Sequence, residues 1–264
     1  MLDITAISKT FHPGTPNARQ ALRQLSLHLE DGEFATIVGS NGAGKSTLFG
    51  AIAGSFYTDE GRILLDGTDL TFQPEHQRSR VIGRLFQDPM RGTAPHMTIE
   101  ENLALAYLRA SHGSPFRRIT PKDRELFRSQ LAQLDMGLEE RMRQPVGLLS
   151  GGQRQALTLL MASLKKPKLL LLDEHTAALD PKTAAKVLEL SDRIVAENGL
   201  TTMMVTHNMK DAIAHGNRLI MMDAGRVVLD IADREKQRLT VPDLLALFSE
   251  AGGTDAADDK LLLA

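Results

Sequence analysis

A glycine-rich segment in the first quarter of the chain has the spacing of a phosphate-binding loop. Gly39, Gly44, Lys45 and Ser46 match the pattern G-x-x-x-x-G-K-[ST]. Glycines let the backbone curl so that its N–H groups point at phosphate oxygens, and the next helix presents its positive end. Lys45 reaches the β- and γ-phosphates, and the Ser46 hydroxyl binds Mg²⁺. The pattern therefore predicts a site for the phosphates of a nucleotide and for Mg²⁺; an ordinary strand-to-helix turn is the alternative.

All nine residues of the loop are candidate nucleotide contacts. They are Gly39, Ser40, Asn41, Gly42, Ala43, Gly44, Lys45, Ser46 and Thr47.

Two carboxylates end a run of four leucines later in the chain. Asp173 and Glu174 follow Leu169–Leu172, which is typical of a buried strand. An Asp in this position holds Mg²⁺ in nucleotide-hydrolysing proteins, usually through water. Because neighbouring side chains on a strand point in opposite directions, Glu174 has a different task. We expect it to polarise the attacking water as a general base; a solvated acidic turn is the alternative.

The elements around these motifs are those of an α/β protein. Residues 34–38 form a buried strand that leads into the loop, and a helix follows as far as Ala53. Alternating apolar and polar residues predict antiparallel strands at 2–8 and 25–29, and Asp66-Gly67 marks a hairpin turn. Between about residues 87 and 149 the sequence favours helices. Thr98 begins one that runs through Ala110, and Thr120-Pro121 begins another.

The α/β pattern resumes after residue 168. We expect a helix at 181–197, a strand at 202–205, a short helix after His207, a hairpin around Ala224-Gly225 and a last helix near Pro242. Helices that alternate with short apolar strands imply a parallel sheet. Residues 251–264 are predicted to be a mobile tail.

Composition narrows the possible functions. Of the 264 residues 42% are hydrophobic and 24% charged, and the net charge is −2, which disfavours a nucleic-acid partner. The absence of cysteine excludes disulfide, zinc-thiolate and thiol-nucleophile chemistry. No apolar run approaches the ~18 residues of a membrane span, and the N-terminus lacks the features of a secretory signal. We therefore expect a soluble protein, with any membrane pore on another chain.

The segment Leu149-Ser150-Gly151-Gly152-Gln153 reads LSGGQ. Together with the loop at 39–47 and the pair Asp173-Glu174, in this order, it resembles the ATPase domain of the ABC superfamily. The resemblance extends from Phe11 to about Gly225. It implies that Ser150, Gly151, Gly152 and Gln153, at the start of a helix, face the γ-phosphate held by a second ATPase subunit. A simple helix cap at Ser150 describes the same local geometry.

Four further residues match the family pattern. The resemblance implies that Phe11 stacks on adenine, although an ordinary aromatic at a strand end is the alternative. Gln87 corresponds to the glutamine that contacts Mg²⁺ and the lytic water, and Asp180 to an aspartate at the dimer interface. His207 corresponds to the histidine that binds the γ-phosphate. His175 departs from the pattern, because many members have proline there, and we expect it to alter only the stiffness of the turn.

The family fold implies a P-loop NTPase core with a parallel sheet, an N-terminal antiparallel β-subdomain and an inserted α-helical subdomain. We expect one ATPase domain over residues 1–250, with the helical insertion at about 88–163 of a RecA-like core. A single ATPase unit without membrane helices resembles the detachable subunit of a bacterial importer. The sequence at residues 92–102 and 172–178 resembles that of ATPases from importers of amino-acid-like solutes.

The expected partners follow from this resemblance. They are a second ATPase subunit, expected to be identical, a permease on a separate chain whose helix enters a groove beside Gln87, and indirectly an extracytoplasmic solute-binding protein. The protein would lie on the cytoplasmic face of the cell membrane. A non-transport ATPase acting on a soluble macromolecular complex remains the alternative. A basic group on the helical region is interpreted as a solvated face or a contact with lipid or permease: Arg109, Arg117, Arg118, Lys122, Arg124 and Arg128.

Overall fold

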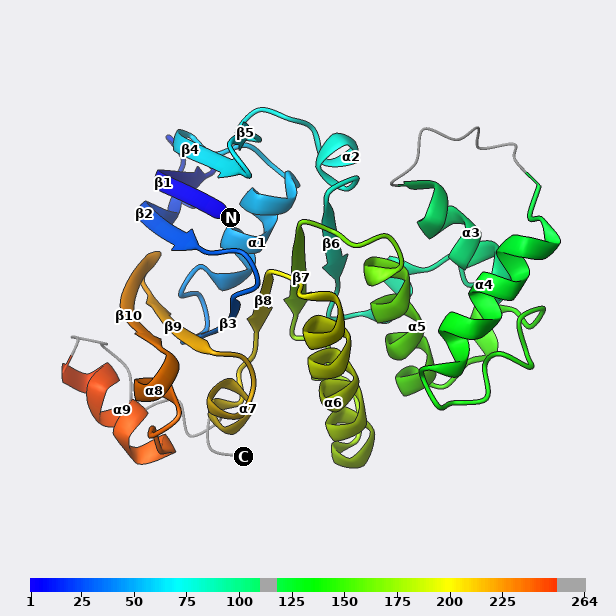
Figure 1. The fold of residues 1–264 in the computed structure, drawn as a ribbon. Coiled ribbons are helices and arrows are strands. Elements are labelled where there is room, and N and C mark those ends of the chain that lie inside the picture. Colours follow the sequence, from blue (N-terminus) through cyan, green and yellow to red (C-terminus); the bar gives the residue numbers. More distant parts are fainter. Residues whose placement is uncertain (110–117, 251–264) are drawn as a thin grey trace. The chain divides into compact units, whose positions relative to one another are not determined.

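The computed structural model describes residues 1–109 and 118–250. The predicted tail, Ala110 and Arg117 lie outside these residues. The chain divides into two compact units, each described here by itself: Met1–Arg78 together with the chain from Leu200 onward, and Ser79–Gly199 (Figure 1).

The first unit begins with an antiparallel sheet in the order β2-β1-β4-β5. Its strands are β1 (Leu2–Phe11), β2 (Arg19–Leu29), β4 (Glu60–Leu65) and β5 (Thr68–Asp69). The alternation in the sequence predicted the first two strands, which extend further than expected. Their apolar residues are buried on one face, as in a sheet that has one solvated side.

A second set of strands in this unit is mainly parallel. β3 (Phe34–Gly39) lies between β8 (Thr202–Val205) and β9 (Arg218–Asp223), parallel to both, and β10 (Arg226–Ala232) runs antiparallel to β9. Every residue of β3 and β8 is buried, which explains their continuous apolar sequence. The predicted parallel sheet and the hairpin at Ala224-Gly225 are therefore confirmed.

Short helices accompany these strands. They are α1 (Lys45–Ala53), α2 (Glu75–Arg78), α7 (Met209–Ala214), α8 (Asp233–Lys236) and α9 (Val241–Glu250). Helices α7 and α9 close a core in which Met209, Met221, Leu244 and Phe248 pack against Val38. The methionines of β8 and β9 are buried, as expected of core residues.

Arg78 is a fully buried cation at the end of α1. Its guanidinium donates to the carbonyl oxygens of Ala51 (2.6 Å), Ile52 (2.9 Å), Thr71 (3.0 Å) and Gln73 (2.8 Å). The last carbonyls of a helix lack intrahelical donors and carry its negative dipole end. Arg78 supplies hydrogen-bond donors to these carbonyls and a positive charge at the negative end of the helix. Burial lowers the pKa of Arg78.

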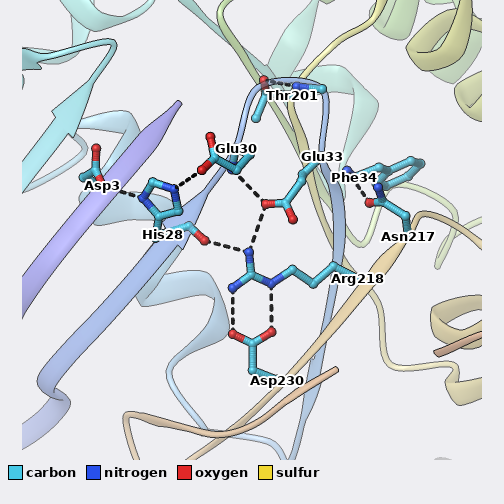
Figure 2. A network of polar contacts seen from close by, with 10 residues as sticks. Asp3, His28, Glu30, Glu33, Phe34, Thr201, Asn217, Arg218 and Asp230 are labelled. Atoms are coloured by element: carbon cyan, nitrogen blue, oxygen red, sulfur yellow. Dashed lines mark hydrogen bonds and ion pairs between the residues drawn. The ribbon is translucent and has the colours of Figure 1, made fainter. Parts of the chain in front are cut away.

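A polar network joins strands of this unit (Figure 2). Arg218 of β9 donates to both carboxylate oxygens of Asp230, at 2.8 and 2.7 Å, and to Glu33 at 2.9 Å. Beside it, the His28 ring bridges Asp3 and Glu30, so β2 is tied to β1. The carboxylate partners raise the pKa of His28, chiefly through the hydrogen bond with Asp3.

The second unit holds two parallel strands, β6 (Ile82–Leu85) and β7 (Leu169–Asp173). The sequence did not predict β6, because Gly83 and Arg84 interrupt its apolar residues, whereas the equally short β8 is predominantly apolar. The helices are η1 (Pro89–Gly92), α3 (Ile99–Arg109), α4 (Pro121–Ala132), η2 (Val146–Leu148), α5 (Gly151–Ser163) and α6 (Pro181–Asn198). Thr98 exchanges hydrogen bonds with Glu101 at the start of α3, and Thr120 does so with Asp123 at the start of α4, where the sequence predicted the caps.

Across the described ranges of the chain, no helix combines the length and apolar character needed to cross a membrane.

Candidate nucleotide-binding site

The loop between β3 and α1 has a backbone that requires glycine. Gly39, Gly42 and Gly44 have φ values of 150°, 86° and 102°, in the left-handed region. A Cβ on Gly44 would lie 2.7 Å from the Ala21 carbonyl oxygen, and one on Gly39 would collide with the Met222 carbonyl. The spacing of glycines in the motif thus reflects both turn geometry and close packing against β2 and β9.

Lys45 begins α1 and folds back over the loop. Its ammonium donates to the carbonyl oxygens of Gly39 at 2.6 Å and Ser40 at 3.0 Å, and its side chain is buried. A buried ammonium beside the positive end of a nine-residue helix makes the loop an anion site. Ser46, the next residue, is exposed and offers a hydroxyl at the same place.

The loop is held from outside by residues that the sequence did not identify. The Gly225 N–H donates to the Ala43 carbonyl at 2.9 Å, and Ser40 donates to the Asp223 carboxylate at 3.3 Å. Arg19 donates to the Gly42 carbonyl at 3.2 Å. These partners come from β2 and from the β9–β10 hairpin, far away in the sequence. No local pattern could have paired them with the loop.

His207 and Phe11 complete the candidate residues of the first unit. Because β3 and β8 are neighbouring parallel strands, the loop and His207 leave the same sheet edge. His207 is exposed, and the following Asn208 caps α7 through hydrogen bonds from Lys210 and Asp211. Phe11 is half-buried at the end of β1, with its ring edge-on to Phe56 at 5.2 Å.

Gln87, Asp173 and Glu174 lie at one edge of the second unit. Leu85 pairs with Leu172, so the residues that follow each strand emerge side by side at the carboxyl end. Glu174 has a left-handed backbone, φ 45°, which turns it out of the strand after Asp173. Burial raises the pKa of Asp173, while the nearby Arg84 acts in the opposite direction.

His175 is buried rather than exposed at this turn. Its Nε2 lies 3.1 Å from the Ser191 hydroxyl of α6. That hydroxyl donates its single hydrogen to the Val187 carbonyl at 2.9 Å, so the histidine must be the donor. The imidazole therefore carries a hydrogen on Nε2 and anchors the turn after β7 to α6, which a proline could not do.

The LSGGQ segment starts α5 in an exposed position. Ser150 and Gln153 exchange hydrogen bonds of 3.3 Å, forming a capping box, and Ser150 and Gly151 face solvent. A side chain on Gly152 would collide with Thr183 of α6, so the glycine permits close packing of the two helices. The segment forms the exposed N-terminus of a 13-residue helix, which is a favourable place for an anion to bind.

Asp180 caps the next helix, α6. Its carboxylate accepts from the Thr183 N–H at 3.1 Å, and the hydrogen bonds with Thr183 lower its pKa. The residue remains exposed although its carboxylate caps the helix.

The second unit also contains a groove of about 310 Å³ whose lining includes Phe86, the residue before Gln87 in the chain. It is lined chiefly by Arg84, Phe86, Pro89, Leu105, Arg109 and Met161. Burial lowers the pKa of Arg109, whose Nε has no hydrogen-bond partner among the described residues. Arg109 thus does not belong to a solvated basic face, whereas Arg124 pairs with Glu100 at 2.9 Å.

The candidate residues thus fall into two sets. Phe11, the loop and His207 belong to the first unit, and Gln87, Asp173, Glu174, the LSGGQ segment and Asp180 belong to the second. Ser46, Gln87 and Asp173 supply oxygen donors, which suit Mg²⁺. Within the described ranges, no three or more carboxylate or imidazole side chains cluster as a metal site.

A glycine loop with a lysine before a helix, on a parallel sheet, defines a P-loop nucleotide-binding protein. Residues 22–177 match the ABC transporter family. The chain belongs to this family, as one of its ATP-binding and ATP-hydrolysing subunits.

Individual relatives agree with this membership. The chain is 47% identical over 253 residues to a tyrosine transport ATP-binding protein of Clostridioides difficile strain R20291, covering 95% of this chain and all of that protein. It is 38% identical to the spermidine/putrescine import ATP-binding protein PotA of Haemophilus ducreyi, covering 81% of this chain but 54% of the relative.

A solved structure supports the fold. The dimeric ATP-binding cassette MJ0796, in a post-hydrolysis state with ADP and Pi, superposes with a TM-score of 0.76 at 28% identity, covering 89% of this chain and 99% of that one. The predicted α/β P-loop fold is therefore confirmed.

Proposed function

We propose that the chain is the ATPase subunit of a solute importer, and that its cargo is an aromatic amino acid or a related compound. The observation that carries this proposal is the combination, in one chain, of the lysine loop and an exposed LSGGQ helix start. The 47% identity to a tyrosine transport ATP-binding protein over almost the whole of both chains supports the cargo class. The relatives considered are named for transport or import, which disfavours the non-transport alternative.

The residues of the two sets would act together on ATP. Lys45 and the loop amides bind the β- and γ-phosphates, and Phe11 stacks on adenine. Ser46, Gln87 and Asp173 hold Mg²⁺, which neutralises charge on the phosphates when bound. Glu174 accepts a proton from the attacking water, and His207 donates a hydrogen bond to the γ-phosphate.

Two subunits are required for complete sites. Ser150 and Gly151 are exposed at a helix N-terminus, and together with Gly152 and Gln153 they would bind the γ-phosphate of the partner's ATP. Asp180 lies near the same surface and would contact the partner. We expect a homodimer, because a symmetric pair of one chain satisfies both loops.

The membrane partner would dock in the groove whose lining includes Phe86. A helix of a permease on a separate chain fits a groove with an apolar wall and adjacent cations. Binding of ATP closes the dimer, hydrolysis reopens it, and the permease follows. We expect the subunit on the cytoplasmic face of the membrane, with an extracytoplasmic solute-binding protein as an indirect partner.

The test of the catalytic assignment is Glu174→Gln. We expect ATP binding to remain, turnover to fall by about 100-fold or more, and a dimer to accumulate with ATP. Size-exclusion chromatography and phosphate release measure these results, and Glu197→Gln on the exposed end of α6 is the matched control. Hydrolysis at the normal rate by Glu174→Gln would show that the base is another group.

The cargo class needs a different experiment. The transporter is purified through a tag on this subunit and reconstituted in vesicles with ATP inside. Uptake of labelled tyrosine, phenylalanine and putrescine is then compared. Tyrosine-dependent ATP consumption supports the proposed class, and a response to putrescine alone contradicts it.

A further inference from the structure

Arg84 of β6 touches both the groove and the proposed metal aspartate. Its Nη2 lies 3.6 Å from the Asp173 carboxylate, and the centre of its guanidinium lies 4.7 Å from the centroid of the Phe86 ring. The side chains of Arg84 and Asp173 are only 17% and 15% exposed. Arg84 and Phe86 also line the groove. One planar cation therefore contacts a wall of the docking groove and a carboxylate that would bind Mg²⁺.

The charge on Arg84 has a direct consequence for a second cation. A guanidinium stays ionised at any physiological pH, and at this low exposure its attraction for Asp173 is weakly screened. At 3.6 Å it forms an ion pair that offsets the charge of the carboxylate. A divalent cation that approaches Asp173 must overcome the repulsion of Arg84 or displace it. Pairing with Arg84 thus opposes metal binding at Asp173.

The other face of the guanidinium is held by an aromatic ring. Arg91 also lies over the Phe86 ring, with the centre of its guanidinium 5.1 Å from the ring centroid. Two arginine side chains therefore make cation–π contacts with the same ring. Phe86 immediately precedes Gln87 and lines the groove. Because Arg84 and Phe86 both line the groove, a helix docked there would lie against this pair.

We propose that Arg84 is a positioning residue that competes with Mg²⁺ for Asp173 while the groove is empty, and that a docked permease helix relieves the competition. This rests on the proposed function, because it assigns Mg²⁺ to Asp173 and a permease helix to the groove. It adds a residue through which occupancy of the groove alters the metal site.

The experiment measures the affinity of the isolated subunit for a fluorescent ATP analogue as Mg²⁺ is titrated. Arg84→Met should lower the Mg²⁺ concentration for half-maximal binding by about three- to tenfold, as expected for removal of one weakly screened charge. Affinity in EDTA should change little. A merely structural role predicts weaker binding or none, so a gain in Mg²⁺ affinity identifies competition.

Three variants serve as matched comparisons. Arg91→Met removes an equal charge from the same ring but not the ion pair with Asp173. Because the charge of Arg91 also acts on Asp173, this variant should lower the Mg²⁺ requirement by less than Arg84→Met does. Arg84→Lys keeps the charge but loses the planar stack, and should keep the high requirement. Should Arg84→Met fail to fold, Arg84→Gln, which is polar but uncharged, carries the same expectation.

The proposed effect of the docked permease helix is tested on the complete transporter, which is co-purified through this subunit. The ratio of its ATPase rate to that of the isolated subunit should fall at least threefold in Arg84→Met and Arg84→Lys, but not in Arg91→Met. An unchanged Mg²⁺ requirement in Arg84→Met overturns the inference. If Lys45→Ala still weakens nucleotide binding and Glu174→Gln still stops turnover, the proposed function survives that result.

Discussion

At the residue scale, the buried cations of this protein divide into those that face a ligand and those that serve the fold. Lys45 lies over the carbonyls of a glycine loop, where a phosphate would attract it away. Arg78 is fully buried, and its guanidinium donates to four backbone carbonyl oxygens. The sequence identifies only Lys45, because the motif that contains it is local. Arg78 and Arg84 have no signature, since their acceptors come from other elements.

Replacement of Arg78 by methionine should destabilise the protein by about 3 kcal/mol or more. The substitution leaves buried carbonyls at the end of α1 without donors, and such losses are costly. For a chain of this size, the midpoint of thermal unfolding should fall by roughly 10 °C. Differential scanning fluorimetry measures the change. Arg80→Met, at an exposed position two residues along, should shift the midpoint by less than about 2 °C. Equal shifts in the two variants would contradict the structural role of Arg78.

At the element scale, side chains between strands and helices fix the directions in which the site residues leave the sheet. His175 ties the turn after β7 to α6, and thereby fixes the backbone of Glu174. Gly152 allows α5 to pack against α6, so the LSGGQ cap and Asp180 start neighbouring helices. The β9–β10 hairpin holds the phosphate loop through Gly225. These pairings decide the local geometry around the candidate site residues that the motifs name.

The pairing of β1 with β2 should depend on pH through His28. Its pKa is raised, chiefly by the hydrogen bond with Asp3, so protonated His28 favours the folded state. This contribution is complete below the unfolded pKa of about 6.5 and is lost as pH rises through the higher folded value. Because the pair is exposed, it contributes no more than about 1 kcal/mol.

Urea unfolding at pH 6 and pH 9 measures this dependence. The difference in unfolding free energy between the wild type and His28→Gln should be larger at pH 6 and close to zero at pH 9. His96→Gln, an exposed histidine in the loop before α3, is the control. A difference that grows toward pH 9 would have the wrong sign for a raised pKa.

At the scale of the whole molecule, the proposed function requires two copies. Each copy would contribute its lysine loop to one ATP and its LSGGQ helix start to the other. The exposed Ser150 and Gly151 are consistent with such a surface. A dimer is also the state of the similar cassette MJ0796. Complementation between two inactive variants tests this arrangement directly.

Lys45→Ala and Ser150→Asp should each abolish ATPase activity alone and restore part of it when mixed. Asp keeps the helix cap at position 150 but places a negative charge toward the partner's γ-phosphate. In a random mixture about a quarter of all sites combine an intact loop with an intact LSGGQ segment. Phosphate release should recover accordingly, and Ser150→Thr should be nearly active alone. A mixture no more active than its components would contradict shared sites.

The sequence alone determined the chemistry and the class of fold. The P loop, the LSGGQ segment and the leucine strand before Asp173-Glu174 are local patterns, since each depends on the backbone of a few consecutive residues. Most strand and helix types followed for the same reason, but the strand β6 and the short helices α2, α8, η1 and η2 were not predicted.

Only the tertiary structure decided what supports those motifs. The burial of Arg78, the contact of Arg84 with Asp173 and the anchoring of His175 to Ser191 involve residues that lie far apart in the chain. Their interactions arise because parallel strands bring distant carboxyl ends to one sheet edge, and because buried polar groups must find partners wherever packing places them.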